Sequence, residues 1–200
     1  MRQKFKLILA SASPRRAEIL RKAGFDFEVV PAHADESPRP GEAATDYVRR
    51  LAEEKARTVA RQLAKDAFGE SSFIIGADTV VVIDTEILGK PSSPTNAREM
   101  LRRLSGKTHE VYTGLAVLQG NDSAIRTAVE TTRVTFAALS EKEIEDYIAT
   151  GEPFDKSGAY AIQGRGGKFI SRIEGCYFNV MGLPLARLYA MLHDLNGVQR

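Results

Sequence analysis

Residues 73–83 form a long apolar run, FIIGADTVVVI, that is interrupted near its centre by one carboxylate, Asp78. Such a run is typical of a buried strand. An unpaired carboxylate in an apolar environment is costly, so Asp78 has to meet a cation, a metal ion or water from a cleft. The alternative is a buried aspartate that holds loop backbone. Gly76 and Ala77 are small enough to let a ligand approach, which favours a functional role for Asp78.

Segments with a strand pattern alternate with segments of helical period along the rest of the chain. Strands are expected at residues 6–10, 27–30, 73–83, 87–88, 110–119, 124–136 and 169–173, and helices at 14–23, 44–63, 95–104, 141–149 and 184–195. The pair 110–119 and 124–136 is expected to turn at residues 120–122. This order predicts an α/β fold, a mixed sheet flanked by helices, with residues 1–200 as one domain around a cleft.

The segment SASPRR, residues 11–16, follows the first strand and begins the first helix. Ser13 suits the N-cap and Pro14 the first helical position. Arg15 and Arg16 then lie in the first turn, where free N–H groups and the macrodipole already make the potential positive. The placement costs stability unless an anion binds, so the segment predicts a phosphate site. The alternative is a surface arginine pair at a helix start.

Two lysines and one glutamate extend this prediction. Lys55 lies on the apolar stripe of the helix expected at 44–63, so it either reaches solvent past its own methylenes or points toward the cleft. Lys90 lies in a turn, where lysines are usually solvated. A polyphosphate site with these cations would ordinarily also use Mg²⁺, and Glu36 and Asp78 are the candidate metal ligands.

Overall composition limits the partners of the chain. The formal net charge is only +2, which argues against extended nucleic-acid binding. Cys176 is the only cysteine and the histidines lack metal-ligand spacing, so a disulfide framework and a zinc site are not expected, and a reducing cytosol fits best. The N-terminal apolar run is too short for a signal peptide, and no apolar stretch of membrane length occurs.

A glycine-rich polar segment, DKSGAYAIQG at residues 155–164, carries the side-chain amide of Gln163. An amide donates and accepts at once, which suits the O4 acceptor and N3–H donor of uracil or thymine.

Six segments together resemble the Maf-type nucleoside triphosphate pyrophosphatases. They are SASPRR at 11–16, EEKA at 53–56, GADTVV at 76–81, GKP at 89–91, SGKTH at 105–109 with YTG at 112–114, and DKSGAYAIQG at 155–164. The resemblance implies a Maf/inosine-triphosphatase-like fold with two lobes around a central cleft. It also implies hydrolysis of a nucleoside triphosphate to the monophosphate and pyrophosphate, a divalent cation (Mg²⁺ or Mn²⁺), a cytoplasmic setting and a possible homodimer.

Within that family the chain resembles the branch that prefers dTTP and UTP. The branch associated with 7-methyl-GTP would be expected to have glutamine at the position of Thr79. The resemblance makes Asp78 the general base and Arg15, Thr79 and Gln163 the specificity positions. The remaining substrate-binding residues that we expect are Ser11, Ser13, Arg16, Lys55, Lys90 and Lys156.

The rival hypothesis is a nucleotide-binding regulator of cell division without turnover. Both hypotheses need the arginine pair, but only a hydrolase needs a buried carboxylate beside it.

Overall fold

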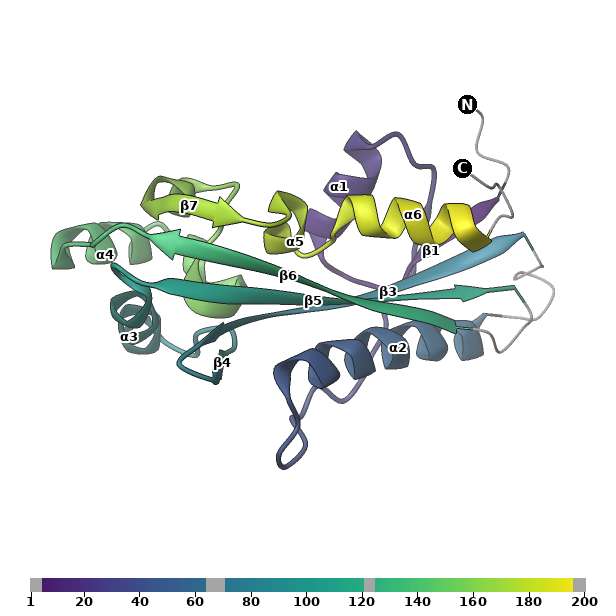
Figure 1. Cartoon of the computed structure of the whole chain (residues 1–200), viewed down its shortest axis with the longest axis horizontal. Coiled ribbons are helices and arrows are strands. Elements are labelled where there is room, and N and C mark those ends of the chain that lie inside the picture. Colours follow the sequence, from purple (N-terminus) through teal and green to yellow (C-terminus); the bar gives the residue numbers. More distant parts are fainter. Residues whose placement is uncertain (1–4, 64–70, 121–124, 196–200) are drawn as a thin grey trace. The chain divides into compact units, whose positions relative to one another are not determined.

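The computed structural model describes residues 5–63, 71–120 and 125–195 (Figure 1). Within these ranges seven strands form one sheet in the order β2-β1-β3-β5-β6-β7, with β4 paired to β3. The strands are β1 Lys6–Leu9, β2 Glu28–Val29, β3 Ser72–Ile83, β4 Glu86–Leu88, β5 Thr108–Gln119, β6 Ile125–Phe136 and β7 Ile170–Glu174. The sheet is mixed, because β1 is parallel to β2 and β3 whereas β4 and β7 are antiparallel to their neighbours.

Six α-helices accompany the sheet in the described part of the chain: α1 Pro14–Lys22, α2 Ala44–Gln62, α3 Pro94–Leu104, α4 Glu141–Ile148, α5 Tyr177–Met181 and α6 Leu185–Leu195. The predicted class, a mixed α/β fold with a helix-flanked sheet, is therefore confirmed. No described helix is long and apolar enough to cross a membrane.

The chain divides into two compact units. Unit 1 comprises Met1–Asp78, Thr113–Glu130 and Gly182–Arg200, and unit 2 comprises Thr79–Tyr112 and Thr131–Met181. The strands β3, β5 and β6 each contribute residues to both. The single domain and the two lobes around a cleft stay predictions, and each unit is described by itself below.

In unit 1, helices cover both faces of the sheet, with α2 on one face and α1 and α6 on the other (Figure 1). Ala52, Ala56 and Val59 of α2 pack against Ile8 of β1 and Ile74 of β3. Alternate residues of a strand point to opposite faces. The whole of Leu7–Leu9 is buried because both faces are covered.

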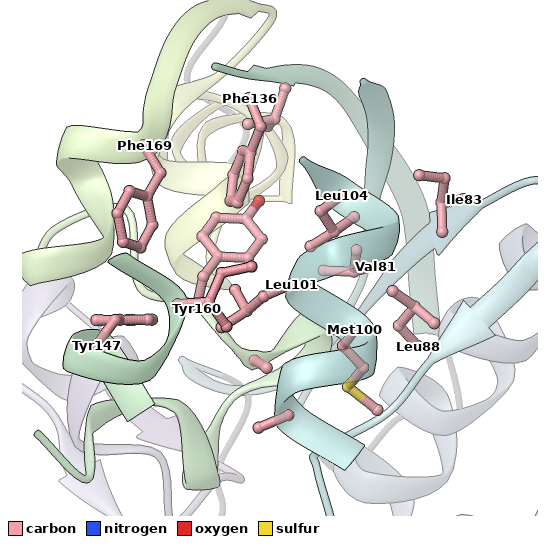
Figure 2. Close-up of a cluster of buried hydrophobic side chains, with 14 of the residues drawn as sticks. Val81, Ile83, Leu88, Met100, Leu101, Leu104, Phe136, Tyr147, Tyr160 and Phe169 are labelled. Atoms are coloured by element: carbon pink, nitrogen blue, oxygen red, sulfur yellow. The ribbon is translucent and has the colours of Figure 1, made fainter. Parts of the chain in front are cut away.

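Unit 2 has its own apolar core, which Figure 2 shows. The ring of Tyr147 on α4 packs edge-on against Phe169, and Phe136 of β6 packs edge-on against Tyr160. Leu101 and Leu104 of α3 complete this cluster from the other side (Figure 2). The core thus joins α3, α4 and the loop before β7.

Several boundaries differ from the sequence predictions. The strand expected at 27–30 is reduced to Glu28–Val29, and both residues are exposed. The short helix α5 was not expected, and neither were three 3₁₀ turns in and around the glycine-rich segment, at Glu152–Asp155, Ser157–Ala159 and Arg165–Phe169. Of the turn predicted at 120–122 only Gly120 is described, and residues 121, 122 and 124 lie outside the described ranges.

Candidate active site

Helix α1 begins where the sequence predicts, with Ser13 as N-cap and Pro14 in the first turn. The Ser13 side chain does not cap the helix. Instead the backbone N–H of Ser13 donates to the hydroxyl of Ser11 at 3.2 Å, which shapes the turn after β1. No acidic residue occupies the first turn of α1, so the charged side chains of that turn, Arg15 and Arg16, are both positive.

The two arginines of this turn differ. Arg16 is buried, its Nε donates to the Gly182 carbonyl at 2.8 Å, and its Nη1 donates to the Ser11 hydroxyl at 2.9 Å. Arg15 is half-buried. The expectation that both arginines cost stability without an anion stays a prediction, although the two hydrogen bonds of Arg16 oppose the helix-end repulsion.

A buried ion cluster lies on the α2 side of unit 1. The ammonium of Lys55 contacts Oδ1 of Asp78 at 2.7 Å and Oε1 of Glu36 at 2.6 Å. Lys55 and Asp78 are each less than a tenth exposed, whereas the Glu36 side chain is largely exposed. Lys55 thus points inward from the apolar stripe, and the buried Asp78 meets a cation, as its place in the strand requires.

Burial raises the pKa of the Asp78 carboxyl above its ordinary value, although the positive charges of Lys55 and Arg16 oppose the shift. Burial also lowers the pKa of Arg16, and the negative charges of Asp78 and Glu36 act against that shift. Arg16, Asp78, Lys55 and Glu36 therefore form one electrostatic group within unit 1. A carboxylate of raised basicity beside fixed cations is suited to accept a proton while an anion is bound.

Sequence reasoning missed Tyr47, which holds Glu36 in place. The Tyr47 hydroxyl donates to the Glu36 carbonyl at 2.7 Å. Burial, with the nearby charges of Asp78 and Glu36, raises the pKa of Tyr47 to about 12, so its hydroxyl remains a donor. The signal was present in the sequence, since Tyr47 lies eight residues before Lys55 and thus two i,i+4 steps away on the same helix face.

A half-buried ion pair also fixes this loop. Arg50 on α2 binds both carboxylate oxygens of Glu42, at 2.6 and 2.7 Å, and donates to the Ser37 carbonyl at 3.2 Å. Hydrogen bonding from Arg50 lowers the pKa of Glu42 to about 2. The loop that carries Glu36 is therefore tied to the helix that carries Lys55.

Two glycines allow α2 to approach the sheet closely enough to form this cluster. A Cβ on Gly76 of β3 would lie 2.0 Å from the Ala52 carbonyl oxygen, and one on Gly114 of β5 would lie 2.1 Å from that of Val48. The expectation that Gly76 leaves room for a ligand is wrong, because the helix backbone fills that space. Its role is to bring Lys55 within reach of Asp78.

The residues that could hold a metal ion are Glu36 and Asp78. Among the described residues no group of three or more histidine, cysteine, aspartate and glutamate side chains could hold one. The two carboxylates converge on one ammonium, that of Lys55. Mg²⁺ uses one or two carboxylates together with substrate phosphates and water, so this pair fits a metal that arrives with its substrate.

In unit 2 the glycine-rich segment brings other predicted residues together. The Ser157 hydroxyl donates to the Thr79 carbonyl at 3.3 Å, and the Gly158 N–H donates to the Gly89 carbonyl at 3.1 Å, next to Lys90. Gly158 has a positive φ of 72°, and a Cβ there would meet the Val81 side chain at 2.9 Å. The segment is thus attached to β3 immediately after Asp78 and to the chain before Lys90.

Three side chains of unit 2 that the sequence predicts to bind substrate lie in or beside these connected loops. Lys90 and Gln163 are exposed, and Gln163 lies on a turn in which the Gly164 N–H donates to the Ala161 carbonyl at 3.3 Å. Lys156 donates to the Glu152 carbonyl at 2.8 Å and pairs with Asp155. The substrate roles predicted for these residues stay predictions.

The mixed sheet, the arginine-bearing start of α1 and the buried aspartate–lysine pair define the chain as an α/β protein with charged groups buried in unit 1. Comparison with known families is more specific. Residues 6–195 match the family described as Maf-like protein, and the chain belongs to that family.

Curated relatives cover nearly the whole chain. A protein of Koribacter versatilis (strain Ellin345) named dTTP/UTP pyrophosphatase is 53% identical over 93% of this chain and 92% of its own length. Proteins of that name from Syntrophus aciditrophicus (strain SB) and Geotalea uraniireducens (strain Rf4) are 48% and 47% identical, over 96% and 100% of this chain and 91% and 100% of their own lengths. The solved structure of the Staphylococcus aureus Ham1 protein is 13% identical, with a TM-score of 0.47 over 94% of this chain and 98% of that one.

Proposed function

We propose that this protein is a nucleoside triphosphate pyrophosphatase that hydrolyses dTTP and UTP, and related modified pyrimidine nucleotides, to the monophosphate and pyrophosphate. The observation that carries the proposal is the buried Asp78, held by Lys55 beside Glu36 and within the electrostatic reach of Arg16. The names of relatives that are 47–53% identical over nearly the whole chain support the same activity.

In the proposed reaction a water molecule attacks the α-phosphorus and the bond between the α-phosphorus and the bridging oxygen breaks. Asp78 accepts a proton from the water, and pyrophosphate leaves. Arg15, Arg16, Lys55 and Lys90 bind the triphosphate charge, with Ser11, Ser13 and Lys156 as further contacts. Fixed cations stabilise the charge that develops in the transition state.

A divalent cation, Mg²⁺ or Mn²⁺, is part of the proposal, with Glu36 and Asp78 as its ligands. Such an ion would neutralise phosphate charge and lower the pKa of bound water. Asp78 then has two partly competing roles, as base and as ligand, and Lys55 orients it in either.

The alternative, a nucleotide-binding regulator of cell division without turnover, is not favoured. A binding protein needs the arginines of α1, but a carboxylate buried beside them repels the triphosphate. This repulsion would weaken substrate binding without benefit in a protein that only binds nucleotides, whereas a hydrolase needs the carboxylate for the reaction.

Base preference is assigned to Gln163, with Arg15 and Thr79 as the other specificity positions. The Gln163 amide would pair with O4 and N3–H of uracil or thymine, whereas cytosine offers the opposite pattern. A cytoplasmic setting, a homodimer and the absence of a nucleic-acid partner complete the proposal, and the near-neutral net charge of +2 supports the last of these.

The test is to incubate the protein with UTP, dTTP, CTP and GTP in turn, with Mg²⁺ or Mn²⁺, and to identify the products. The proposal predicts monophosphate and pyrophosphate, with the highest kcat/KM for UTP and dTTP. Release of orthophosphate alone, or binding without turnover, would contradict the activity. A preference for GTP would contradict the base assignment.

A further inference from the structure

The carboxylate of Glu152 holds together the turn that carries Gln163. Its Oε2 accepts the backbone N–H of Arg165 at 3.1 Å, and its Oε1 accepts the backbone N–H of Gly166 at 3.1 Å. Oε1 also accepts the hydroxyl of Tyr147 at 2.8 Å. Three donors from two segments of unit 2 therefore converge on one side chain.

The hydroxyl of Tyr147 contacts the turn on the N-terminal side of Gln163. It accepts the backbone N–H of Ala161 at 3.1 Å while it donates to Glu152. The Tyr147 ring is buried against Phe169, with ring centroids 5.1 Å apart, so the hydroxyl has a fixed position (Figure 2). Gln163 is thus flanked by two backbone positions, Ala161 and Arg165, that both depend on the Tyr147–Glu152 pair.

The turn is also packed tightly onto this carboxylate. A Cβ on Gly164, the residue after Gln163, would lie 2.4 Å from Oε2 and 2.5 Å from Oε1 of Glu152. Because it has no Cβ, Gly164 lets the backbone lie directly on the carboxylate. The position of the turn is therefore set by Glu152.

Glu152 is suited to this role because it remains ionised. Burial opposes ionisation, but hydrogen bonds from the Arg165 N–H, the Tyr147 hydroxyl and the Gly166 N–H outweigh it, and the pKa of Glu152 lies below its ordinary value. An ionised carboxylate accepts several hydrogen bonds, and each is stronger than a neutral one. A glutamine would present an NH₂ group to at least one of these donors.

We propose that Glu152 is a positioning residue for base selectivity, which acts through the backbone of residues 161–166 to fix the amide of Gln163. The inference rests on the proposed function, in which Gln163 contacts the base. Glu152 itself touches neither the phosphates nor the reacting atoms in this proposal. Loss of the Glu152 carboxylate should reduce the discrimination between bases more than it slows turnover.

The experiment compares the wild type with Glu152→Gln and with Tyr147→Phe, which keeps the buried ring and removes only the hydroxyl. Glu145→Gln on α4 is the matched control, since its exposed carboxylate lies 3.5 Å from the Arg98 side chain and takes no part in the hydrogen bonds described above for the turn that carries Gln163. For each variant kcat and KM are measured with UTP and CTP, together with the inhibition constant of pyrophosphate. Thermal melts establish that each variant is folded.

The ratio of kcat/KM for UTP to that for CTP is expected to fall about tenfold in Glu152→Gln, and less in Tyr147→Phe, because a mispositioned contact loses discrimination. The pyrophosphate inhibition constant and the Glu145→Gln ratio should not change. If Glu152→Gln does not fold, the ratio of kcat/KM for UTP to that for CTP in Tyr147→Phe tests the inference instead.

An unchanged UTP/CTP ratio in folded variants, or an equal fall for both substrates with weaker pyrophosphate binding, would overturn the inference and make Glu152 a structural residue. Failure of the proposed function shows separately, in the wild type alone, as absence of turnover or of a preference for UTP over CTP.

Discussion

Arg15 and Arg16 have the same sequence context and different surroundings. Arg16 lies under the turn after β1 and is hydrogen-bonded to the carbonyl of Gly182, 166 residues further along the chain. Arg15 stays partly exposed at the same helix end. Arg16 is therefore held by the surrounding structure, whereas Arg15 is more accessible to an incoming anion.

We expect Arg16→Ala to lower the free energy of unfolding by about 1–3 kcal/mol, because the Gly182 carbonyl and the Ser11 hydroxyl lose a buried donor. Arg15→Ala should cost less, since it also removes a positive charge from a helix N-terminus, a term of about 0.3–1 kcal/mol at low salt. Urea unfolding of the ligand-free variants measures both. Equal losses would show that the two arginines have equivalent structural roles.

The sequence could place both arginines in the first turn of a helix, because Ser13 and Pro14 are local signals. It could not assign the partner of Arg16, since that contact depends on how a distant segment packs. The same limit applies to Glu152: neither Gly151 nor Pro153 beside it indicates that its carboxylate closes a later turn.

At the scale of elements, the contact between α2 and β3 decides whether the site forms. Lys55 was found from the sequence because it interrupts an apolar stripe, and the bounds of α2 were predicted to within one residue from the same periodicity. Gly76 was noticed but misinterpreted, because the sequence does not show that a helix backbone lies against it. The short helix α5 and the 3₁₀ turns lack the periodicity needed for prediction.

We expect Gly76→Ala to destabilise the protein by about 1–3 kcal/mol or more, since the new methyl group would overlap the Ala52 carbonyl. It should also lower activity, because α2 would move away from β3 and separate Lys55 from Asp78. Gly89→Ala is the matched control for stability, as a Cβ there meets no atom within 4 Å. Similar melting temperatures for the two variants would contradict the close approach of α2.

For the molecule as a whole, a histidine that was given no role from the sequence, His109, is buried in unit 2. His109 is 2% exposed, and its Nε2 lies 2.9 Å from the Tyr160 hydroxyl. Its Nδ1 has no hydrogen-bond partner among the described residues. Burial lowers the pKa of His109 to about 4, so the folded protein holds it neutral.

This burial makes stability depend on pH. Below pH 6.5 the unfolded chain protonates His109 while the folded protein does not until about pH 4. The stability that the folded protein gains by keeping His109 neutral is therefore fully present above pH 6.5. It is lost as the pH falls toward 4, and the free energy of unfolding decreases by about 3 kcal/mol in total. Chemical unfolding at a series of pH values, with His109→Gln for comparison, measures it. A variant with the same slope between pH 6.5 and 4 as the wild type would contradict this assignment.

The most direct test of the site is Asp78→Asn, which preserves the volume of the side chain and removes its negative charge. We expect turnover of UTP to fall by about 10²–10⁴-fold, because the amide cannot act as a base, while UTP still binds and the fold remains intact. The measurement is kcat for UTP hydrolysis, with binding followed by calorimetry and folding by circular dichroism. Substantial activity in a folded Asp78→Asn variant would show that Asp78 is a structural residue and that hydrolysis does not depend on the Lys55–Asp78 pair.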